Sequence, residues 1–584
     1  MPSVALAART AAVRTGALRL RWPAGIALAA YVLVAFLYFG LRALGHSGRT
    51  YIGTPNADAQ LEIWAFAWWP HALLNWHNPF YTHALWAPSG VELAWPTMAP
   101  GLALAFTPLT YLLGPTGSFD VCATLMPALS AWTAFLLCRH VTRSFWPSLA
   151  GGYVFGFSAY ELGSLQHIQL TGVFLIPLVA LVVLRYLEGT LTRRDFAVRL
   201  GVLVAGELTI STEISFTLVL ALLGSLVLAF ALVPSARPRL RSLPLPLLGG
   251  YTFGAVLASP LAFYLLKYFH GHPFNPISPT QWSADVLNAV IPSDILALGT
   301  RFTSISDHFT GSRWEQSGYY GLPALVVLVW FAVRRWRVPA TRFLVVAIAL
   351  AVFFSFGSWL HVRGHQTVTL PWEHIAYLPL FSNVLTVRFS MYITLAIGVV
   401  LALWAASPLA PVWARAALVA LAVLAFFPNL RRNDWAITTN EPAFIRAGLY
   451  KSCLSPTDNA LVFPASFHGN EMLWQADAWF GFRMAEGYVS AVPPKQFQHP
   501  PEVNELATFG EVRHGLTAAI REYARLKHVT VILVEQGPVW NYAGGRWQLE
   551  RNPWPAWISR LATPHRVGGL LLYRLDGSRP CASA

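Results

Sequence analysis

Charged residues are scarce in this chain of 584 residues: Lys, Arg, Asp and Glu make up 12% of it, against about 25% in soluble domains. Hydrophobic residues make up 55%, and the mean hydropathy is +0.48. This balance excludes an ordinary soluble protein and predicts an integral membrane protein. The formal net charge of +14 does not indicate nucleic-acid binding, because the arginines fall in short clusters between apolar runs.

Cysteine is also rare, and nucleotide-binding motifs are absent. Cys122 and Cys138 lie on one predicted helix, about 24 Å apart, too far to pair. Cys453 and Cys581 lie near the two ends of the C-terminal region, where they form either a disulfide or two free thiols. None of the four has metal-site spacing. The chain has neither a G-x-G-x-x-G after a strand nor a P-loop, so a nucleotide sugar is not the expected donor.

The first long apolar run extends from Ala24 to Leu41 and follows several arginines. It is about long enough to span a bilayer, and no A-x-A-like cleavage site precedes Asp58. The run is therefore predicted to be a transmembrane helix rather than a signal peptide. The positive-inside rule places residues 1–23 in the cytoplasm and Asp58 outside. The arginines are Arg9, Arg14, Arg19 and Arg21.

Further apolar runs alternate with basic turns. They predict a mainly α, polytopic protein of the cell membrane with about eleven transmembrane helices in residues 24–428. The segment from Met98 to Leu113 contains two prolines and is expected to be interfacial or re-entrant, whereas Phe119–Leu137 is expected to span the membrane. Large extracytoplasmic loops are expected at residues 43–118, 267–318 and 358–388.

The membrane pattern stops after Asn429, and residues 429–584 are predicted to form an extracytoplasmic C-terminal domain. The stretches ALVFP, VTVILVEQ and LLLYRL are typical of short buried strands. GNEMLWQADAWF, HGLTAAIREYARLK and PWPAWISRLA are typical of helices. An α/β or α+β domain is therefore expected.

Carboxylates gather in the loops that are predicted to lie outside. Asp58 opens the stretch ADAQLEIW, and Glu161 and His167 fall in the next outward loop. A lone loop acid is more often solvated or paired with a nearby base such as His46 or Arg49. Two acids from successive outward loops can, however, come together in one site at the outer end of the helices.

The order of these features resembles the polytopic glycosyltransferases with the GT-C fold, which use a polyprenyl-phosphate sugar as donor. In that class an aspartate lies early in the first outward loop, interfacial helices follow, then a helix ending in a basic inner turn, and often a second acid in the next outward loop. Here those places are held by Asp58, by Leu61–Leu113, by LLCRHVTR and by Glu161. The resemblance covers the chain up to about residue 430 as topology.

The resemblance implies a membrane glycosyltransferase with a glycan, lipid or protein acceptor outside the cytoplasm. Asp58 is the expected general base on the acceptor hydroxyl. The chain has DAQLE in place of a D-x-D or Asp-Glu pair, so Gln60 and Glu62 are candidates to share its role, and the question of a divalent cation stays open.

A departing polyprenyl phosphate needs positive charge close to the outer leaflet. Arg388 is the first candidate, because a fork of donors suits phosphate. Lys267 and Arg313 come next. For any one of these cations, snorkelling to the interface is the commoner role.

Aromatic residues are dense after Asp58. Most are expected to be interface anchors, although Trp64 and Trp68 share a helical face and could stack on a sugar ring. The histidines of this loop do not have H-E-x-x-H spacing, so no metal site is predicted. Glu207 and Glu213 flank a predicted outer turn, and acids at membrane depth are usually functional, so Glu213 is a second catalytic candidate.

Two other functions compete with an enzyme. A lipid or oligosaccharide transporter would be expected to have internal repeats and ionisable groups near the midplane, and no convincing repeat is present. An inert membrane scaffold with a binding domain is disfavoured by the clustered acids and by the long loop 267–318, which is expected to act as a lid.

Overall fold

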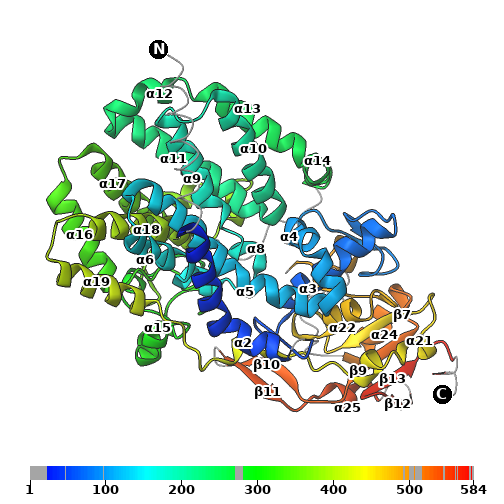
Figure 1. The fold of residues 1–584 in the computed structure, drawn as a ribbon. Helices are drawn as coiled ribbons and strands as arrows, with labels where there is room; N and C mark the ends of the chain where they lie inside the picture. Colours follow the sequence, from blue (N-terminus) through cyan, green and yellow to red (C-terminus); the bar gives the residue numbers. More distant parts are fainter. Residues whose placement is uncertain are drawn as a thin grey trace.

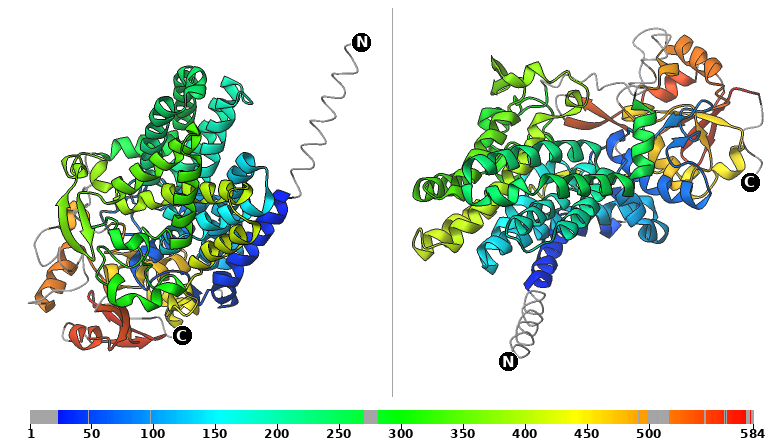
Figure 2. Two further views of the ribbon diagram at one scale, coloured as in Figure 1. Left: turned by 90° about the vertical axis from the view of Figure 1, so that its left-hand side faces the viewer. Right: turned by 90° about the horizontal axis from the view of Figure 1, so that it is seen from above.

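The computed structural model describes residues 23–46, 48–96, 98–269, 281–490, 493–498, 506, 516–543, 546–559, 561, 563–577 and 581. A large helical part is followed along the chain by a smaller part that contains the main β-sheet (Figure 1). The sheet lies at one end of the helical part, next to helices α3 and α4, in the view from above as well (Figure 2).

Long helices make up the helical part because its sequence consists of apolar runs without strand-like alternation. Their bounds are α3 Ala57–Leu74, α4 Pro100–Ala105, α5 Thr107–Thr142, α6 Phe145–Gly156, α7 Ala159–Gly163, α8 Ile168–Thr171, α9 Leu175–Leu187, α10 Arg193–Ile210, α11 Thr212–Leu232, α13 Pro244–Leu257, α14 Ser259–Lys267, α16 Leu322–Arg335, α17 Pro339–Ser355, α18 Ser390–Ala406 and α19 Val412–Ala425.

Five helical segments among the described residues are long and apolar enough to cross a membrane, and α13 with α14, bent by 82°, would be a sixth. Two shorter apolar helices, α17 and α19, add to these. The count of about eleven spans stays a prediction. The five segments are Pro23–His46, Thr107–Thr142, Ile168–Leu187, Thr212–Leu232 and Thr386–Ala406.

Helix α5 breaks where the sequence indicates a change of role. Gly114 has φ +77°, a conformation that glycine adopts at little cost, and it separates the first two turns from the rest of the helix. Tyr111 and Leu112 before the break are exposed, as expected of a segment that lies against lipid, whereas Phe119 after it is fully buried. The break therefore falls between the predicted interfacial segment and the predicted spanning helix.

Close packing at the centre of the bundle depends on two glycines. A Cβ on Gly151 of α6 would lie 2.5 Å from the carbonyl oxygen of Gly398 in α18, and a Cβ on Gly398 would lie 2.6 Å from the carbonyl oxygen of Gly151. Such distances are repulsive, so only glycine lets these two backbones touch. The contact fixes α18, whose N-terminal end carries a charged residue of the candidate site.

The main sheet has five strands in the order β12-β13-β9-β7-β8. Strand β7 is parallel to both β8 and β9, while β13 is antiparallel to β9 and to β12. The three predicted strands are β7, β9 and β13, and the three predicted helices contain α22, α24 and α25. The bounds are β7 Asn459–Phe463, α22 Glu471–Asp477, β8 Arg483–Met484, α24 Leu516–Leu526, β9 Val531–Glu535, β10 Val539–Ala543, β11 Arg546–Glu550, α25 Trp554–Ile558, β12 His565–Val567 and β13 Leu570–Arg574.

A disulfide closes the C-terminal part: the Sγ atoms of Cys453 and Cys581 lie 2.10 Å apart. This decides between the two alternatives that the sequence left open. Cys122 and Cys138 are free and buried in the helical part.

The first loop of the helical part is built onto the edge of this sheet. Backbone amides of Trp86 and Ala87 donate to carbonyls of Glu486 and Met484, and the Met484 amide donates to Ala84. Farther along, β1 (Thr50–Tyr51) pairs with β6 (Ile437–Thr438). Main-chain hydrogen bonds therefore join the residues on either side of α3 to the C-terminal part.

Candidate active site between α3 and the C-terminal part

Asp58 lies in the first turn of α3, where Asn56 caps the helix by accepting a hydrogen bond from the Asp58 amide. A carboxylate at this position is stabilised by the helix dipole. The Tyr488 hydroxyl donates to Asp58 Oδ1 at 2.9 Å, and the Asn56 amide donates to Oδ2 at 3.1 Å. His167 Nε2 lies 3.4 Å from Oδ2. Asp58 and His167, which the sequence places in successive outward loops, are thus brought together, with 24% and 20% of their side chains exposed.

These partners keep Asp58 ionised. Burial raises the pKa of this carboxyl, but the hydrogen bond and charge of His167, with the hydrogen bonds from Tyr488 and Asn56, outweigh burial, so the pKa lies below its usual value. An ionised carboxylate can accept about four hydrogen bonds. Because Tyr488, Asn56 and His167 occupy three of these positions on Asp58, its carboxylate can accept one more hydrogen bond.

A second charged group lies close by. Arg388, before the first turn of α18, donates from Nε and Nη2 to the two carboxylate oxygens of Glu315 at 3.3 and 2.6 Å, and from Nη1 to Glu213. Burial raises the pKa of Glu315, but the Arg388 charge and hydrogen bonds, and the His167 charge, bring it below its usual value, with Asp58 acting in the opposite direction. Glu315 is thus the electrostatic link between Asp58 and Arg388.

Glu161 belongs to the same neighbourhood, although it forms no ion pair. The pKa of the adjacent Tyr160 is raised by burial above all; Arg388 lowers it, and Glu161, Glu213 and Glu315 raise it. Glu161 is fully buried, and neither carboxyl oxygen accepts a well-formed hydrogen bond. Burial raises the pKa of this carboxyl well above its usual value, which favours its neutral form.

Two further predicted residues follow Asp58 on α3. Glu62 is 1% exposed, and burial, with the charge of Asp58, raises its pKa well above the usual value. Gln60 is equally buried and donates to Asn470 at 3.0 Å, and Asn470 donates to Glu535 at 3.2 Å. Gln60 therefore contacts the C-terminal part rather than Asp58.

The predicted aromatic pair has a packing role. Trp64 and Trp68 stack with centroids 5.3 Å apart, and Phe480 meets both rings edge-on at 5.3 Å. The Trp64 indole donates to Gln475 of α22 at 2.7 Å. Both tryptophans are buried, which leaves no open face for a sugar. Stacking of either ring on a sugar stays a prediction that would require Phe480 to move.

The other two predicted cations are in different surroundings. Arg313 binds Asp294 at 2.8 Å and Asp307 at 3.4 Å. Lys267, at the end of α14, lies over the rings of Tyr264 and Tyr268. No described carboxylate forms an ion pair with Lys267.

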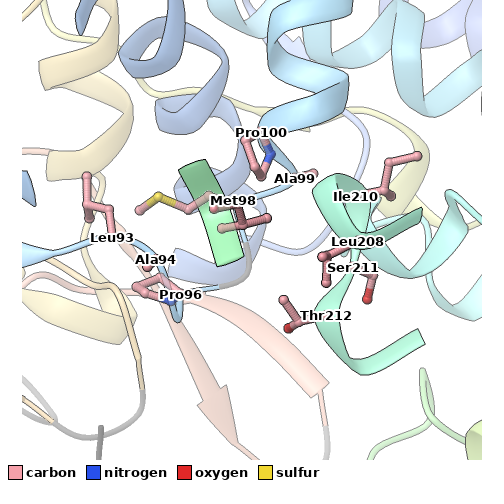
Figure 3. Close-up of a pocket in the computed structure, with 11 residues that line it drawn as sticks. Leu93, Ala94, Pro96, Met98, Ala99, Pro100, Leu208, Ile210, Ser211 and Thr212 are labelled. Atoms are coloured by element: carbon pink, nitrogen blue, oxygen red, sulfur yellow. The ribbon is translucent and has the colours of Figure 1, made fainter. Parts of the chain in front are cut away.

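A small cavity, lined by apolar side chains together with Ser211 and Thr212, lies between the loop before α4 and the turn between α10 and α11 (Figure 3). It contains about 310 Å³ of space, counting the part that is open to solvent. Ser211 and Thr212, which line it, directly precede Glu213. Its residues are Leu93, Ala94, Pro96, Met98, Ala99, Pro100, Leu208, Ile210, Ser211, Thr212 and Leu261.

Within the described residues, no group of three or more His, Cys, Asp or Glu side chains is placed to hold a metal ion. His71 and His77 have ring centroids 6.0 Å apart, but they lie at the far end of α3 from Asp58.

Two residues of the site were missed in the sequence. Glu315 lies in the long loop 267–318 together with several other acids, and only the bidentate contact with Arg388 separates it from them. Tyr488 lies in EGYVS, where no motif or periodicity points to a membrane-domain aspartate 430 residues away.

Solved structures with this fold are membrane glycosyltransferases of the GT-C class. The chain is similar over 95% of its length to ArnT from Cupriavidus metallidurans bound to undecaprenyl phosphate, with a TM-score of 0.50, 12% identity and 98% of that chain covered. It is similar over 92% to the archaeal oligosaccharyltransferase AglB from Archaeoglobus fulgidus in complex with an inhibitory peptide and a dolichol-phosphate, with a TM-score of 0.50, 11% identity and 75% coverage.

A third similar structure is the arabinofuranosyltransferase AftD from Mycobacteria, with a TM-score of 0.53 and 15% identity; 96% of this chain matches 42% of that longer one. The fold is therefore the GT-C fold of multi-pass membrane glycosyltransferases. No curated protein matches the sequence significantly. By sequence, residues 27–427 match the model of the family described as a domain of unknown function, DUF6311, and the chain belongs to this family.

Proposed function

We propose that the protein transfers a sugar from a polyprenyl phosphate to a hydroxyl group of an acceptor at the outer face of the cell membrane. The observation that carries this proposal is an ionised carboxylate, Asp58, held by Tyr488, His167 and Asn56 where the helical part meets the C-terminal part. The GT-C fold supports the class of reaction, and the lipid phosphates bound by ArnT and AglB support the class of donor.

Asp58 acts as the general base. Its carboxylate accepts the proton of the acceptor hydroxyl while the hydroxyl oxygen forms a bond to the anomeric carbon of the sugar. The bond between that carbon and the phosphate oxygen breaks, and the electron pair leaves with the polyprenyl phosphate. A base of this kind contributes about 10²–10⁴-fold to the rate.

Positive charge for the departing phosphate comes from Arg388. Its contacts with Glu213 and Glu315 use three of the five N–H donors of a guanidinium. The two acids orient the group, and the remaining two N–H donors are available to a phosphate oxygen. Glu213 thus acts by positioning, and Glu161, whose neutral form burial favours, is proposed to act as a hydrogen-bond donor within the site.

The lipid part of the donor is proposed to follow the cavity residues between the loop before α4 and the α10–α11 turn, which would have to move apart, because the enclosed volume is about 20 Å³. Its floor of Leu, Ile, Met and Pro side chains suits an isoprenoid, and Glu213 follows the cavity residue Thr212 directly. Lys267 lies on the same helix as the cavity residue Leu261 and would provide a second positive charge. Arg313, which forms ion pairs with Asp294 and Asp307, is proposed to shape the loop 267–318.

An extracytoplasmic C-terminal part agrees with this direction of transfer. A disulfide such as that between Cys453 and Cys581 persists in oxidising compartments. Nucleotide sugars are cytoplasmic, so a site on the other side needs a sugar that has already been carried across on a lipid.

The test is the release of free polyprenyl phosphate by the purified protein in lipid nanodiscs. A panel of polyprenyl-phosphate sugars and a crude envelope glycan fraction would be supplied. Wild type should release the lipid phosphate, and Asp58→Asn should lower the rate by at least a hundredfold. Glu522→Gln, an exposed acid on α24, is the matched control and should behave like wild type. Equal release by Asp58→Asn and wild type would refute the assignment of the base.

A further inference from the structure

Four aromatic side chains of the C-terminal part meet beside Asp58: Phe467, His468, Tyr488 and Trp547, referred to below as the aromatic cluster. Phe467 lies 5.7 Å from Tyr488, 6.1 Å from Trp547 and 5.5 Å from His468, between ring centroids. His468 lies 5.9 Å from Trp547. All four are partly exposed, in contrast to the buried pair Trp64 and Trp68.

The cluster is at the position in the sheet where α/β proteins bind ligands. From β7 the chain passes to β8 on one side and later to β9 on the other, so β7 borders the point at which the strand order reverses. Ligands of open α/β sheets bind at this point, outside the carboxyl ends of the strands. Phe467 and His468 follow β7, and Tyr488 follows β8. Trp547, from the β10–β11 hairpin, covers the same end.

Tyr488 connects the cluster to the chemistry. Its ring packs on Phe467, while its hydroxyl donates to Asp58. A molecule lying on the cluster would therefore be in contact with the residue that touches the base. The carboxylate of Asp58, with three neighbours, has capacity for one more hydrogen bond, which an acceptor hydroxyl could supply.

The chemistry of the cluster fits a saccharide. A sugar ring has an apolar C–H face and a rim of hydroxyl groups, and it matches an aromatic face, which carries partial negative charge, beside polar atoms. Tyr and Trp supply large contact area at a small cost in conformational entropy. A buried aliphatic surface, as in the cavity of Figure 3, would suit a lipid tail instead.

We infer that the aromatic cluster is the acceptor site and that the acceptor is a saccharide, with a ring stacked on Trp547 or Phe467 and one hydroxyl directed at Asp58. This inference rests on the proposed function for the identity of the reaction. It assigns acceptor recognition to residues beyond 427, where the family match ends.

Binding without a donor tests the inference separately from transfer. The full-length protein in nanodiscs would be titrated with mannotriose, galactotriose and arabinotriose, and with a hydroxyl-containing tripeptide, by saturation-transfer NMR. At least one trisaccharide should bind to wild type, and both Trp547→Leu and Phe467→Leu should weaken that binding at least tenfold. Trp557→Leu, in α25 and 41% exposed, is the matched control and should bind like wild type.

The outcomes separate the two proposals. Loss of trisaccharide binding in Trp547→Leu, with thermal unfolding unchanged, supports the acceptor site whether or not any donor is turned over. Binding by Trp547→Leu and Trp557→Leu that equals wild type refutes it, as does binding of the tripeptide alone or of none of the ligands. In each of these cases the release assay with Asp58→Asn still decides the proposed function.

Discussion

The hydroxyl of Tyr488 donates a hydrogen bond of 2.9 Å to Asp58, a residue 430 positions earlier in the chain. One of the two begins a helix of the helical part, and the other follows a strand of the C-terminal sheet. The pKa of the carboxylate that we propose as the base is thus lowered by the C-terminal part, through Tyr488, as well as by His167 of the helical part. The aromatic ring of the same tyrosine borders the proposed acceptor site, so one residue connects base and acceptor.

Substitution of Tyr488 by Phe should shift the pH dependence of transfer. The Tyr488 hydrogen bond lowers the pKa of Asp58, so its loss raises that pKa, and the base becomes ionised only at higher pH. The acidic limb of the rate profile should move up by about one to two pH units, since a hydrogen bond to a charged group contributes about 1.5–3 kcal/mol. Rates of polyprenyl phosphate release measured from about pH 2.5 upward cover both midpoints, because the pKa of Asp58 in wild type lies below its usual value of about 3.9.

Tyr450→Phe serves as the control, because the Tyr450 hydroxyl donates to a backbone carbonyl in the C-terminal part, away from Asp58. Its profile should coincide with that of wild type. A Tyr488→Phe profile that keeps the midpoint of wild type would show that the hydrogen bond does not set the protonation of the base.

Arg388→Gln should raise the donor concentration that gives half-maximal release. It should also destabilise the protein by about 3–5 kcal/mol, because Glu213 and Glu315 would face each other without a cation. The triple variant Glu213→Gln, Glu315→Gln, Arg388→Gln separates these effects, since it removes the like charges together with the cation. Its thermal stability should recover, while the donor concentration that gives half-maximal release should stay higher than in wild type. Recovery of both would mean that Arg388 has only a structural role.

Glu161→Gln should retain transfer activity and change the pH dependence of stability. Burial raises the pKa of Glu161, so the folded state keeps a proton that the unfolded state loses above its pKa of about 4.3. Wild type therefore loses stability as pH rises from there toward the folded pKa, by up to about 1.4 kcal/mol per unit. The glutamine variant lacks this loss, so its advantage in melting temperature should be larger at pH 7 than at pH 4.5. A fall in rate of a hundredfold or more would instead assign Glu161 a proton-transfer role.

Gln475→Leu should loosen the contact between α3 and α22. The Gln475 side chain accepts from the Trp64 indole and donates to the carbonyls of Ala84 and Phe482. Leucine leaves the Trp64 indole and the Phe482 carbonyl buried without a partner, at about 1–3 kcal/mol each, whereas the Ala84 carbonyl keeps its hydrogen bond from the Met484 amide. A lower melting temperature and faster cleavage by protease between the two parts are expected. Gln366→Leu, on the exposed strand β5 (His365–Thr369), should change neither; equal effects of both substitutions would contradict the role of this contact.

Several elements could be predicted because the signals are local. The apolar runs predicted the helices, the two prolines within Met98–Leu113 indicated a segment distinct from the spanning helix that follows, and short β-branched runs predicted β7, β9 and β13. The prediction that Asp58 converges with the loop of Glu161 and His167 rested on successive outward loops, which neighbouring helices bring together; the structure places His167 beside Asp58. The aromatic pair is different: Trp64 and Trp68 share a face as predicted, but the identity of the group that covers this face, Phe480, is not a local property.

The sequence by itself determined the membrane class, the position of the break in α5 and the presence of a separate C-terminal sheet, because hydropathy, backbone preference and strand periodicity act within a few residues. Only the tertiary structure decided that Cys453 pairs with Cys581, that Arg388 lies between Glu213 and Glu315, and that Tyr488 reaches Asp58. These contacts join segments that are distant along the chain, and their geometry depends on how α3, α18 and the sheet pack together. Charges and hydrogen bonds act over a few ångströms in space, which residue spacing in a sequence does not specify.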